Sequence, residues 1–586
     1  MLKADGETLT SGAVEKAERL SSYFSSVFNR DRNEDDTGAQ KFTQHKVTSC
    51  FASPQSVRKK LESLKTAKSP GPDQVHPRVL KELAEVLSEP ISIILNMSFE
   101  SATLPDNWKT AHISAIHKKG SKHLPENYRP VSLTSVVAKL AESFIRETIM
   151  VHMRDNKLFS KKQFGFLGGR STVLQLLVVL DQWTQILDAG GFVDILYFDF
   201  MKAFDKVPHI GLLKTVERYG ISGLLYDWIR AFLLDRKQRV CIQGSFSGWT
   251  NVESGIPQGS VLGPLLFIIF INELPSKASN AEIFLFADDM KVYNGIGSES
   301  DCENLQKDVD SVCSWAAQST LKFHPEKCKH LRLSLRDHPE HCYTLGDTGS
   351  IINQTDQEKD IGVIFDTKLT FNGHIAAKIN KANSILGIIS RTFEYKSQDI
   401  LILLYKALVR PHLEFANQVW SPYLKKHISA IENVQRRLTR MVPGMKDLSY
   451  QERLIKLKLP SLAYRRLRGD AIEAFKIIRG YYDNEVTSGL FRFVEDSVTR
   501  GHKYKLFKSR SRLDLRKNSF FLRVVDVWNS LPESVVEAPS IQSFERRLDK
   551  FWQNKDIRYD YTAAWYCVTR PAKASVTATE ELALEA

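Results

Sequence analysis

Three aspartates follow apolar segments in this chain, and their positions could support phosphoryl transfer. Asp199 closes the apolar stretch Val193 to Phe198, and the adjacent pair Asp288 and Asp289 comes just after the stretch Glu282 to Phe286. Carboxylates at the ends of neighbouring strands can converge on divalent cations, and Mg²⁺ prefers such oxygen ligands while leaving positions for substrate phosphates. A pair of these ions would activate an attacking hydroxyl and stabilise a leaving pyrophosphate.

A simpler interpretation competes with this one. Aspartate is common in turns that follow strands, because its side chain bonds to its own backbone, and for Asp199 alone we favour that interpretation. The pair Asp288 and Asp289 fits it less well, since two adjacent carboxylates after a very apolar strand repel each other unless a cation or solvent relieves them. The doublet by itself does not identify the chemistry.

Strand and helix patterns alternate around these aspartates. Strands are expected at residues 111–116, 128–133, 193–198, 239–242 and 282–286, and helices at 172–187 and 211–234. This alternation predicts an α/β or α+β centre. A helical pattern at 13–28 precedes a polar linker at 30–38, and the tail after about residue 556 has no core pattern and is expected to be disordered.

The positive charge of the chain is concentrated in one region. The whole sequence has 81 Lys and Arg against 68 Asp and Glu, a formal net charge of +13. Between Lys378 and Gly480 there are 20 Lys and Arg against 8 Asp and Glu, which is typical of a surface that binds a polyanion. Within 431–442 apolar residues recur at intervals of three and four, while Arg436, Arg437 and Arg440 lie off that stripe. One helix face should therefore pack and the other be basic, with a merely solvated face as the competing interpretation.

The seven cysteines show no disulfide or metal-binding pattern. Their number is odd, no CxxC pair occurs and no secretory signal precedes them, so a reducing, intracellular compartment is expected. Cys328 and His330 with the segment 334–342 could be imagined as zinc ligands, but the spacing is irregular, and solvated loop histidines are the better interpretation. No apolar run reaches the roughly 18 residues that a membrane-spanning helix needs.

Several short motifs around the acidic residues, taken in their order along the chain, give further evidence about function. Along the chain come Phe198 to Asp205 (FDFMKAFD), Gly255 to Pro264 (GIPQGSVLGP) and Phe286 to Asp289 (FADD). This order resembles the successive palm motifs of reverse transcriptases. Motifs at 115–120, 127–133, 163–172, 321–329, 360–366, 404–414 and 524–532 are similar to those of non-LTR retrotransposons, the long interspersed elements of the jockey and chicken-repeat branch. The resemblance covers roughly residues 55 to 553.

The resemblance implies an RNA-directed DNA polymerase with an α+β right-hand fold of fingers, palm and thumb. Such an enzyme adds dNTPs to the 3′-OH of a DNA primer on an RNA template, using two Mg²⁺ ions for which Mn²⁺ could substitute. The implied divisions are an N-terminal helical and linker segment at 1–53, fingers and palm at 54–375, a helical basic thumb at 376–482, a C-terminal region at 483–554 and a disordered tail at 555–586.

The palm motifs assign roles near the reacting atoms. By resemblance, Asp199, Asp288 and Asp289 are catalytic, and Asp199, Asp288 and the Phe200 carbonyl are metal ligands. Phe204 stands where the family places an aromatic that fills the space of a ribose 2′-OH and so favours deoxynucleotides. Without the motif, a core phenylalanine would be the ordinary interpretation.

The remaining motifs assign substrate contacts. Lys118 and Arg129 would hold the incoming triphosphate, for which the bidentate guanidinium is well suited. Lys327 would supply a proton or charge to the pyrophosphate. Pro257, Gln258 and Gly259 would shape the nucleotide pocket, Gly362 and Val363 would lie at the primer grip, and Arg436, Arg437 and Arg440 would contact duplex phosphates. Surface cations and a simple turn are the competing interpretations.

Some features depart from the family pattern. Met290 stands where relatives usually have threonine, and Leu167 where an arginine is common. The sequence shows no apurinic-type endonuclease, zinc knuckle or RNase H pattern, so primer extension without target nicking is expected, in the nucleus after a cytoplasmic stage as an RNA-protein particle. A decayed or host-retained RNA-binding protein is the alternative function, and Phe204 disfavours an RNA-dependent RNA polymerase. The sequence does not predict an oligomeric state.

Overall fold

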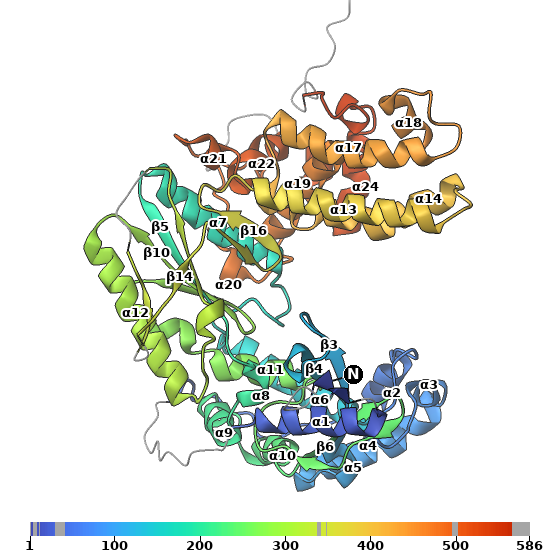
Figure 1. Ribbon diagram of the computed structural model, residues 1–586, viewed down its shortest axis with the longest axis vertical. Coiled ribbons are helices and arrows are strands. Elements are labelled where there is room, and N and C mark those ends of the chain that lie inside the picture. Colours follow the sequence, from blue (N-terminus) through green and yellow to red (C-terminus); the bar gives the residue numbers. More distant parts are fainter. Residues whose placement is uncertain are drawn as a thin grey trace, which may run out of the picture.

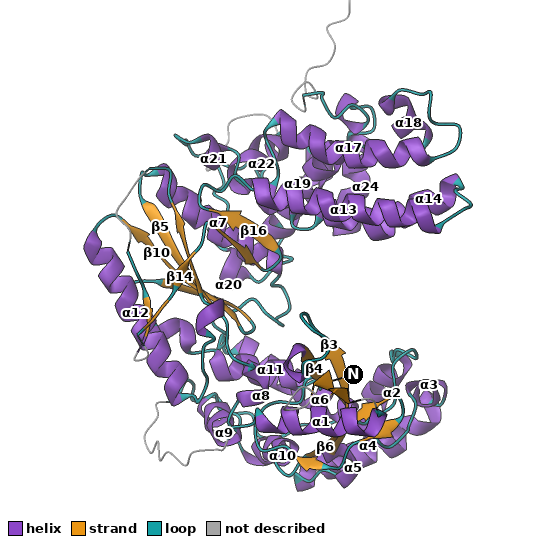
Figure 2. Ribbon diagram, in the orientation of Figure 1, coloured by secondary structure: helices purple, strands orange, loops and turns teal. Residues whose placement is uncertain are grey.

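The computed structural model describes residues 2–3, 9–10, 12–29, 41–336, 341–346, 349–494 and 502–564. Figure 1 shows a C-shaped arrangement of a lower lobe, a central sheet and an upper helical lobe. Figure 2 shows that the upper lobe is almost entirely helical and that strands gather in the central sheet and in the lower lobe. The molecule is therefore of mixed helix and strand composition.

The lower lobe consists of helices around a small sheet. Its elements are α1 (Ala13–Ser26), α2 (Pro54–Glu62), α3 (Pro77–Glu82), α4 (Ala84–Ser101), α5 (Asp106–Lys109), β3 (Thr110–His117), η1 (Pro125–Asn127), β4 (Tyr128–Leu133), α6 (Val136–Asp155), α8 (Ala203–Lys206), α9 (His209–Arg218), α10 (Gly223–Leu233), β6 (Lys237–Ile242), β7 (Ser245–Phe246), β8 (Thr250–Asn251) and α11 (Gly263–Ile271). Strand β3 pairs antiparallel with β4 and parallel with β6. Helix α1 covers this sheet, with Leu20 and Phe24 packed against Ile113 and Val240.

The central part is built on a five-stranded sheet in the order β14-β11-β5-β10-β9. Its elements are α7 (Thr172–Asp188), β5 (Phe192–Phe198), η2 (Leu274–Lys277), β9 (Glu282–Phe286), β10 (Asp289–Ile296), α12 (Glu299–Gln318), η3 (Pro325–Lys327), β11 (Lys329–Leu333), β12 (Thr344–Leu345), β13 (Ser350–Ile351), β14 (Asn353–Gln354), β15 (Gln357–Asp360) and β16 (Val363–Asp366). Strands β9 and β10 form a hairpin, and β10 pairs antiparallel with β5.

The upper lobe follows the β15-β16 hairpin. Its elements are α13 (Asn372–Thr392), α14 (Gln398–Leu404), the π-helical η5 (Tyr405–Val409), α15 (Arg410–Glu414), α16 (Asn417–Trp420), α17 (Lys425–Met441), α18 (Tyr450–Lys456), α19 (Leu462–Ile478), α20 (Asn484–Thr487), α21 (Asp514–Lys517), α22 (Phe520–Asn529), α23 (Glu533–Val536), α24 (Ile541–Phe551) and η6 (Asp556–Arg558). No helix within the described ranges is long and apolar enough to cross a membrane.

The central sheet is buried on both faces, which is why its strands are so apolar. Side chains alternate between the two faces of a strand. Val193 and Ile195 of β5 belong to the core shared with α7 and the upper lobe, whereas Leu196 and Phe198 belong to the core shared with the lower lobe. The sheet therefore joins the two lobes, and the strand ends where the aspartates lie have a rigid base.

Most expected elements are confirmed, and two expectations are wrong. The helix expected at 211–234 is two helices, α9 and α10, because the chain turns at Gly220 with φ of 80°. The tail expected to be disordered from 555 is packed at its start: Ser461 N–H donates to the carbonyl of Arg558 over 2.7 Å, and Ile557 is buried. The expected linker at 30–38 and the tail beyond 564 lie outside the described residues.

Candidate active site

The strand register brings the three aspartates to one edge of the central sheet. Met290 of β10 lies opposite Phe198 of β5 in an antiparallel pair. The next positions toward this edge are Asp289 and Asp199, which the same register places opposite each other, and Asp288 lies in the turn between β9 and β10. Carboxylates that are far apart in the sequence thus lie at the same edge of the folded sheet.

The carboxylates are close enough to affect one another's protonation. Burial, followed by the charge of Asp199, raises the pKa of Asp288. Burial, followed by the charge of Asp288, raises the pKa of Asp289 to about 6. Both pKa values are raised because buried carboxylates lie close together with too little positive charge beside them. Bound cations would stabilise the ionised carboxylates.

Three cationic side chains border the carboxylates. Lys327 Nζ lies 3.1 Å from Asp199 Oδ1. The charges of Lys118 and Arg129 act on Asp288 from the β3-β4 hairpin of the lower lobe. Burial and then the charge of Arg129 lower the pKa of Lys118, while the charge of Asp199 opposes this shift. The edge of the central sheet therefore has negative charge at its centre and positive charge around it.

The turn before Asp288 is fixed by a buried glutamine. Gln163 Oε1 accepts the backbone N–H of Ala287 over 2.9 Å and that of Gly165 over 2.8 Å. Gly165 packs so closely that a Cβ there would lie 2.3 Å from the nitrogen of Ala287, so only glycine is tolerated. Ala287 itself has φ of 56°, a left-handed conformation that this support holds in place.

Arg170, which precedes α7, connects the segment around Gln163 to Asp483 of the upper lobe. Arg170 Nη1 donates to the carbonyls of Ser160 and Gln163 over 2.5 and 2.6 Å. Its other nitrogens bond to Asp483 Oδ2 over 2.7 and 2.8 Å, just before α20. The sequence assigned no role to Asp483, nor to Gln163 although this residue begins the motif at 163–172, because their partners are distant backbone groups and a distant side chain.

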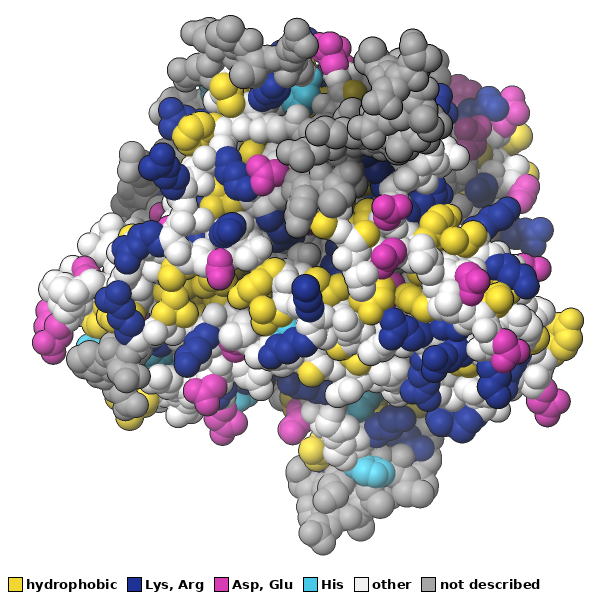
Figure 3. Space-filling view, turned by 90° about the horizontal axis from the view of Figure 1, so that it is seen from above, with side chains coloured by type: hydrophobic (Ala, Val, Ile, Leu, Met, Phe, Trp, Pro, Cys, Tyr) yellow, Lys and Arg dark blue, Asp and Glu magenta, His cyan; other side chains and the backbone are white. Residues whose placement is uncertain are grey.

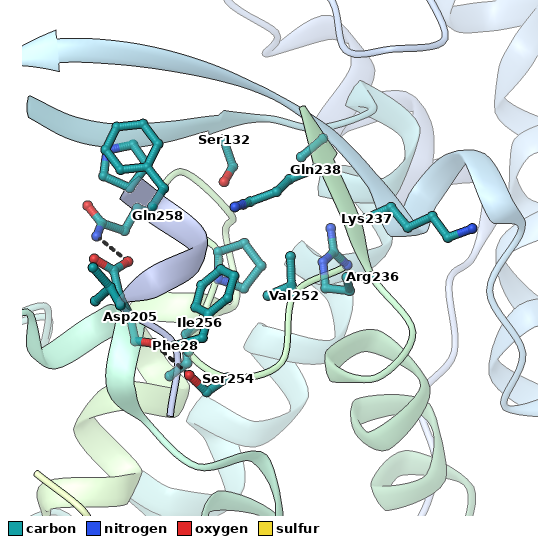
Figure 4. A pocket seen from close by; sticks show the side chains of 16 residues that line it. Phe28, Ser132, Asp205, Arg236, Lys237, Gln238, Val252, Ser254, Ile256 and Gln258 are labelled. Atoms are coloured by element: carbon teal, nitrogen blue, oxygen red, sulfur yellow. Dashed lines mark hydrogen bonds between the residues drawn. The ribbon is translucent and has the colours of Figure 1, made fainter. Parts of the chain in front are cut away.

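The predicted nucleotide loop, residues 257–259, is hydrogen-bonded to Asp205 on one side and to Ser132 of β4 on the other. Gln258 Nε2 donates to Asp205 Oδ1 over 2.8 Å, and Figure 4 shows these two side chains facing each other at one side of a pocket behind the loop. Ser132 N–H donates to the carbonyl of Gln258 over 2.6 Å. A Cβ at Gly259 would lie 2.7 Å from the carbonyl oxygen of Ser132, and φ there is 115°, so this close approach of β4 to the loop needs glycine. Pro257 precedes them and also lines the pocket.

A second buried acid supports the same loop. Glu142 of α6 is almost fully buried and accepts the backbone N–H groups of Val261 and Leu262 over 2.6 and 3.0 Å. These groups belong to the N-terminal end of α11, where unpaired N–H groups and the helix dipole favour a carboxylate. Glu142 was missed because nothing in its local sequence distinguishes it from a surface helix glutamate.

Phe204 is fixed by two other rings. Its ring stacks on Phe267 of α11 with centroids 4.2 Å apart and an interplanar angle of 20°. The exposed Phe166 ring meets it edge-on at 6.4 Å. Phe204 is only half-buried, so part of this residue remains accessible. Phe200, by contrast, is buried and stacks on Phe323 at 4.6 Å.

The residues predicted for the primer grip form the turn and start of the second strand in the β15-β16 hairpin. Gly362 lies in the turn beside the Phe415 ring, and the Val363 side chain is fully buried. Asp360, at the end of β15, forms a buried ion pair with Lys291 of β10. Since Lys291 lies two residues after Asp289, the hairpin is tied to the sheet edge where the three aspartates lie.

The three arginines of α17 have different environments and lie apart from the carboxylates. Arg436 donates to the hydroxyl of Tyr561 over 3.1 Å and stacks over the Tyr450 ring at 4.9 Å. Arg437 and Arg440 are exposed. Figure 3, which views the molecule from above Figure 1, shows Lys and Arg spread over much of this face. The apolar stripe that predicted the packed face of α17 is confirmed, with Ile431, Val434 and Leu438 buried.

One histidine of the imagined zinc site was misassigned, and another, His338, lies outside the described residues. His330 is not a solvated loop residue: it is buried in β11, and its Nε2 lies 3.1 Å from Asp194 Oδ1. Cys328 is buried as well. Within the part of the chain that the structure describes, no three His, Cys, Asp or Glu side chains form a group that could hold a metal ion by themselves.

Known proteins resemble this chain. Residues 116–365 match the family described as reverse transcriptase (RNA-dependent DNA polymerase). The chain is 29% identical over 394 residues to a protein called probable RNA-directed DNA polymerase from transposon BS of Drosophila melanogaster, covering 65% of this chain and 43% of that protein. It is 29% identical over 412 residues to the RNA-directed DNA polymerase from mobile element jockey of Drosophila funebris, covering 67% and 44%. The chain thus spans less than half the length of these curated relatives.

A solved structure of apo telomerase from Candida tropicalis also matches. The match covers 51% of this chain and 60% of that chain, with 11% identity and a TM-score of 0.33. This likeness is too low to establish a shared fold.

Proposed function

Because residues 116–365 match the reverse transcriptase family, we propose that this chain is the RNA-directed DNA polymerase of a non-LTR retrotransposon. It extends the 3′-OH of a DNA primer with dNTPs on an RNA template. The observation that most supports this function is the convergence of Asp199, Asp288 and Asp289 at one strand edge, with Lys118, Arg129 and Lys327 around them.

The carboxylates fit divalent cations. Asp199 and Asp288 would hold two Mg²⁺ ions, or Mn²⁺ in their place, with the Phe200 carbonyl assisting and Asp289 nearby. Mg²⁺ is usually bound through one or two carboxylates together with substrate phosphates and water. When bound, such ions activate the primer hydroxyl and neutralise charge on the transferred phosphoryl group.

The cations of the site would bind the incoming nucleotide. Lys118 and Arg129 approach from the β3-β4 hairpin and would contact the triphosphate, where Arg offers two parallel donors. Lys327, which pairs with Asp199, would supply a proton or positive charge to the departing pyrophosphate. Removing water around these groups strengthens their interaction with phosphate oxygens.

The nucleotide pocket would discriminate by shape. Phe204 would exclude a ribose 2′-OH, and its stack on Phe267 would keep the ring from moving aside. Pro257, Gln258 and Gly259 would form the wall next to the base, and the hydrogen bond from Gln258 to Asp205 would keep this wall in one position.

The lobes would then correspond to parts of a right hand. The lower lobe would form the fingers, the central sheet the palm within residues 54–375, the helices at 376–482 a basic thumb and residues 483–554 a C-terminal region. Gly362 and Val363 would position the primer end, and Arg437 and Arg440 would bind duplex phosphates without reading sequence. The enzyme would act in the nucleus after assembling with its RNA in the cytoplasm.

Primer extension tests this function. Purified protein with an oligo(A) template, an oligo(dT) primer, dTTP and Mg²⁺ should lengthen the primer. A DNA template of the same length controls for template choice. Failure to extend with Mg²⁺ or Mn²⁺, together with tight binding of RNA, would instead support the alternative of a retained RNA-binding protein. The intact carboxylate cluster favours the polymerase.

A further inference from the structure

One exposed face of the lower lobe is apolar along the whole of α4. Leu83, Val86, Ile93, Ile94 and Met97 are between 47% and 72% exposed. The opposite side of the same helix packs against α2 and α10. A surface helix normally has a single apolar stripe, so a second one directed at solvent marks a surface for a partner.

The exposed side chains form one continuous stripe. At 100° per residue, these five positions fall within an arc of about 100° on α4. Val79 of the preceding helix α3 is 51% exposed and extends the apolar surface beyond the start of α4. A stripe of this length and width matches the apolar face of another helix rather than a small ligand.

Acidic residues line one edge of this stripe. Glu82, Glu85, Glu89 and Glu100 lie on the same side of the helical projection, next to the apolar arc. The Glu85 side chain is 78% exposed although Arg58 Nη1 lies 3.4 Å from it, and that of Glu82 is 69% exposed although Arg78 Nε lies 4.0 Å from it. This edge is negative in a chain whose net charge is +13.

We propose that α4 is a docking surface for a basic amphipathic helix of a protein partner. The apolar stripe, named here the α4 face and consisting of Leu83, Val86, Ile93, Ile94 and Met97, would pack against the partner's apolar residues. The glutamate edge would lie against Lys or Arg of the partner, which gives orientation and selectivity.

A second copy of this chain fits the α4 face less well. Two α4 helices packed antiparallel about a two-fold axis would place the same edge of each helix against its equivalent. Glu85 and Glu89 of one copy would then meet the glutamates of the other, and like charges at this spacing repel. A partner with a basic edge removes that repulsion.

Two synthetic peptides test the docking surface. Both are about 20 residues long and have the same leucine stripe; one has Lys and Arg along a single edge, and the other has Glu at those positions. Fluorescence anisotropy should show that the basic peptide binds the full chain at least about tenfold more tightly than the acidic peptide. Equal binding of the two peptides, or no binding of the basic one, overturns the proposal.

Variants of the chain locate the binding. Val86→Gln, Ile94→Gln and Met97→Gln together should abolish binding of the basic peptide, and Glu85→Gln with Glu89→Gln should remove the preference between the peptides. Leu224→Gln with Ile351→Gln is the matched control, since both side chains are exposed and lie outside the α4 face. Binding that survives the triple substitution places the peptide elsewhere and contradicts the proposal.

Light scattering distinguishes a basic protein partner from a second copy of this chain as the occupant of the α4 face. The wild-type chain should have the same molar mass as the triple variant across concentration. A dimer that the triple substitution dissociates would make a second copy the occupant and overturn the proposal of a basic partner. Primer extension reports that each variant is folded, because α4 contributes no residue to the catalytic edge.

Discussion

Arg170 Nη2 lies 2.7 Å from Asp483 Oδ2, although 313 residues separate the two. The Arg170 side chain is only 3% exposed, and through the carbonyl of Gln163 it touches the residue that holds Ala287. A continuous set of contacts therefore runs from the upper lobe to the turn with Asp288. The C-terminal part of the chain is therefore linked to the sheet edge with the three aspartates, although it contributes no residue to that edge.

Asp483→Asn should weaken this link. A buried guanidinium that loses its carboxylate is left partly unpaired, at a cost of about 1–3 kcal/mol. We expect a lower melting temperature and a kcat reduced by about tenfold, with little change in primer-template affinity, because the turn before Asp288 loses its support. Single-turnover kinetics and thermal unfolding measure the two effects.

The neighbouring Glu485 offers a matched control. Its carboxylate also pairs across this interface, with Lys157 at 3.5 Å and Lys161 at 2.9 Å, but these lysines are exposed. Exposed pairs contribute about 0–1 kcal/mol, so Glu485→Gln should leave both kcat and stability nearly unchanged. If Asp483→Asn lowered stability but not kcat, the contact would be structural only.

Phe204→Ala should relax sugar selection. The stack on Phe267 fixes the ring, so its removal opens space where a 2′-OH would lie. Incorporation of rUTP relative to dTTP should rise by at least about tenfold. Phe323→Leu is a suitable control, because that ring packs on Phe198 and Phe200 and not on Phe204. Unchanged selectivity in Phe204→Ala would contradict the assigned role.

The arginines of α17 should separate into two classes. Arg437 and Arg440 are exposed, so replacing both with Gln should flatten the logarithmic salt dependence of primer-template binding by about one to two units. Arg436 is engaged with Tyr450 and Tyr561, so Arg436→Gln should lower the melting temperature and leave that slope unchanged. A slope unaffected by the double substitution would make this face ordinary solvated surface.

Asp194 should make stability depend on acid pH. Burial alone would raise the pKa of this carboxyl, but contacts from Arg332, His330 and Tyr343 outweigh it and hold the pKa well below its usual range. A lowered pKa in the folded state stabilises the protein above the unfolded value of about 3.9, and this contribution is lost as pH falls below that value.

Asp194→Asn isolates this contribution. Removing the charge leaves Arg332 buried without its partner, at a cost of about 3–5 kcal/mol at pH 7. The difference in unfolding free energy between wild type and variant should narrow between pH 5 and about pH 3, because the wild type loses this contribution. Urea unfolding at a series of pH values measures this difference in unfolding free energy. If the difference stayed constant with pH, Asp194 would not be the source of the acid sensitivity.

The strand ends and the helix stripe could be predicted because their signals are local. Apolar runs predicted β5 and β9, and the positions of Asp199 and Asp288 follow from where those runs end. The stripe of Ile431, Val434 and Leu438 predicted the packed side of α17 by its spacing alone. Local patterns also predicted the strands β3 and β4.

The supports of the site could not be predicted from such patterns. Gln163, Glu142 and Asp483 act on backbone groups or side chains that lie far away in the sequence, and each residue type is ordinary on a surface. The same limit explains His330, whose burial depends on the pairing of β11 with β5. The sequence also does not distinguish Arg436 from Arg437 and Arg440, because its partner Tyr561 lies far away along the chain.

Asp288→Asn tests the central claim most directly. The substitution keeps the size of the side chain and removes one negative charge, so RNA and primer binding should be retained. Rapid-quench measurement of a single dTTP addition should show a rate reduced by about a thousandfold or more, equivalent to ~4 kcal/mol of barrier. Asp301→Asn, which changes a partly exposed helix-capping aspartate, should extend the primer at the wild-type rate. A variant Asp288→Asn that extends the primer as fast as wild type would contradict the account.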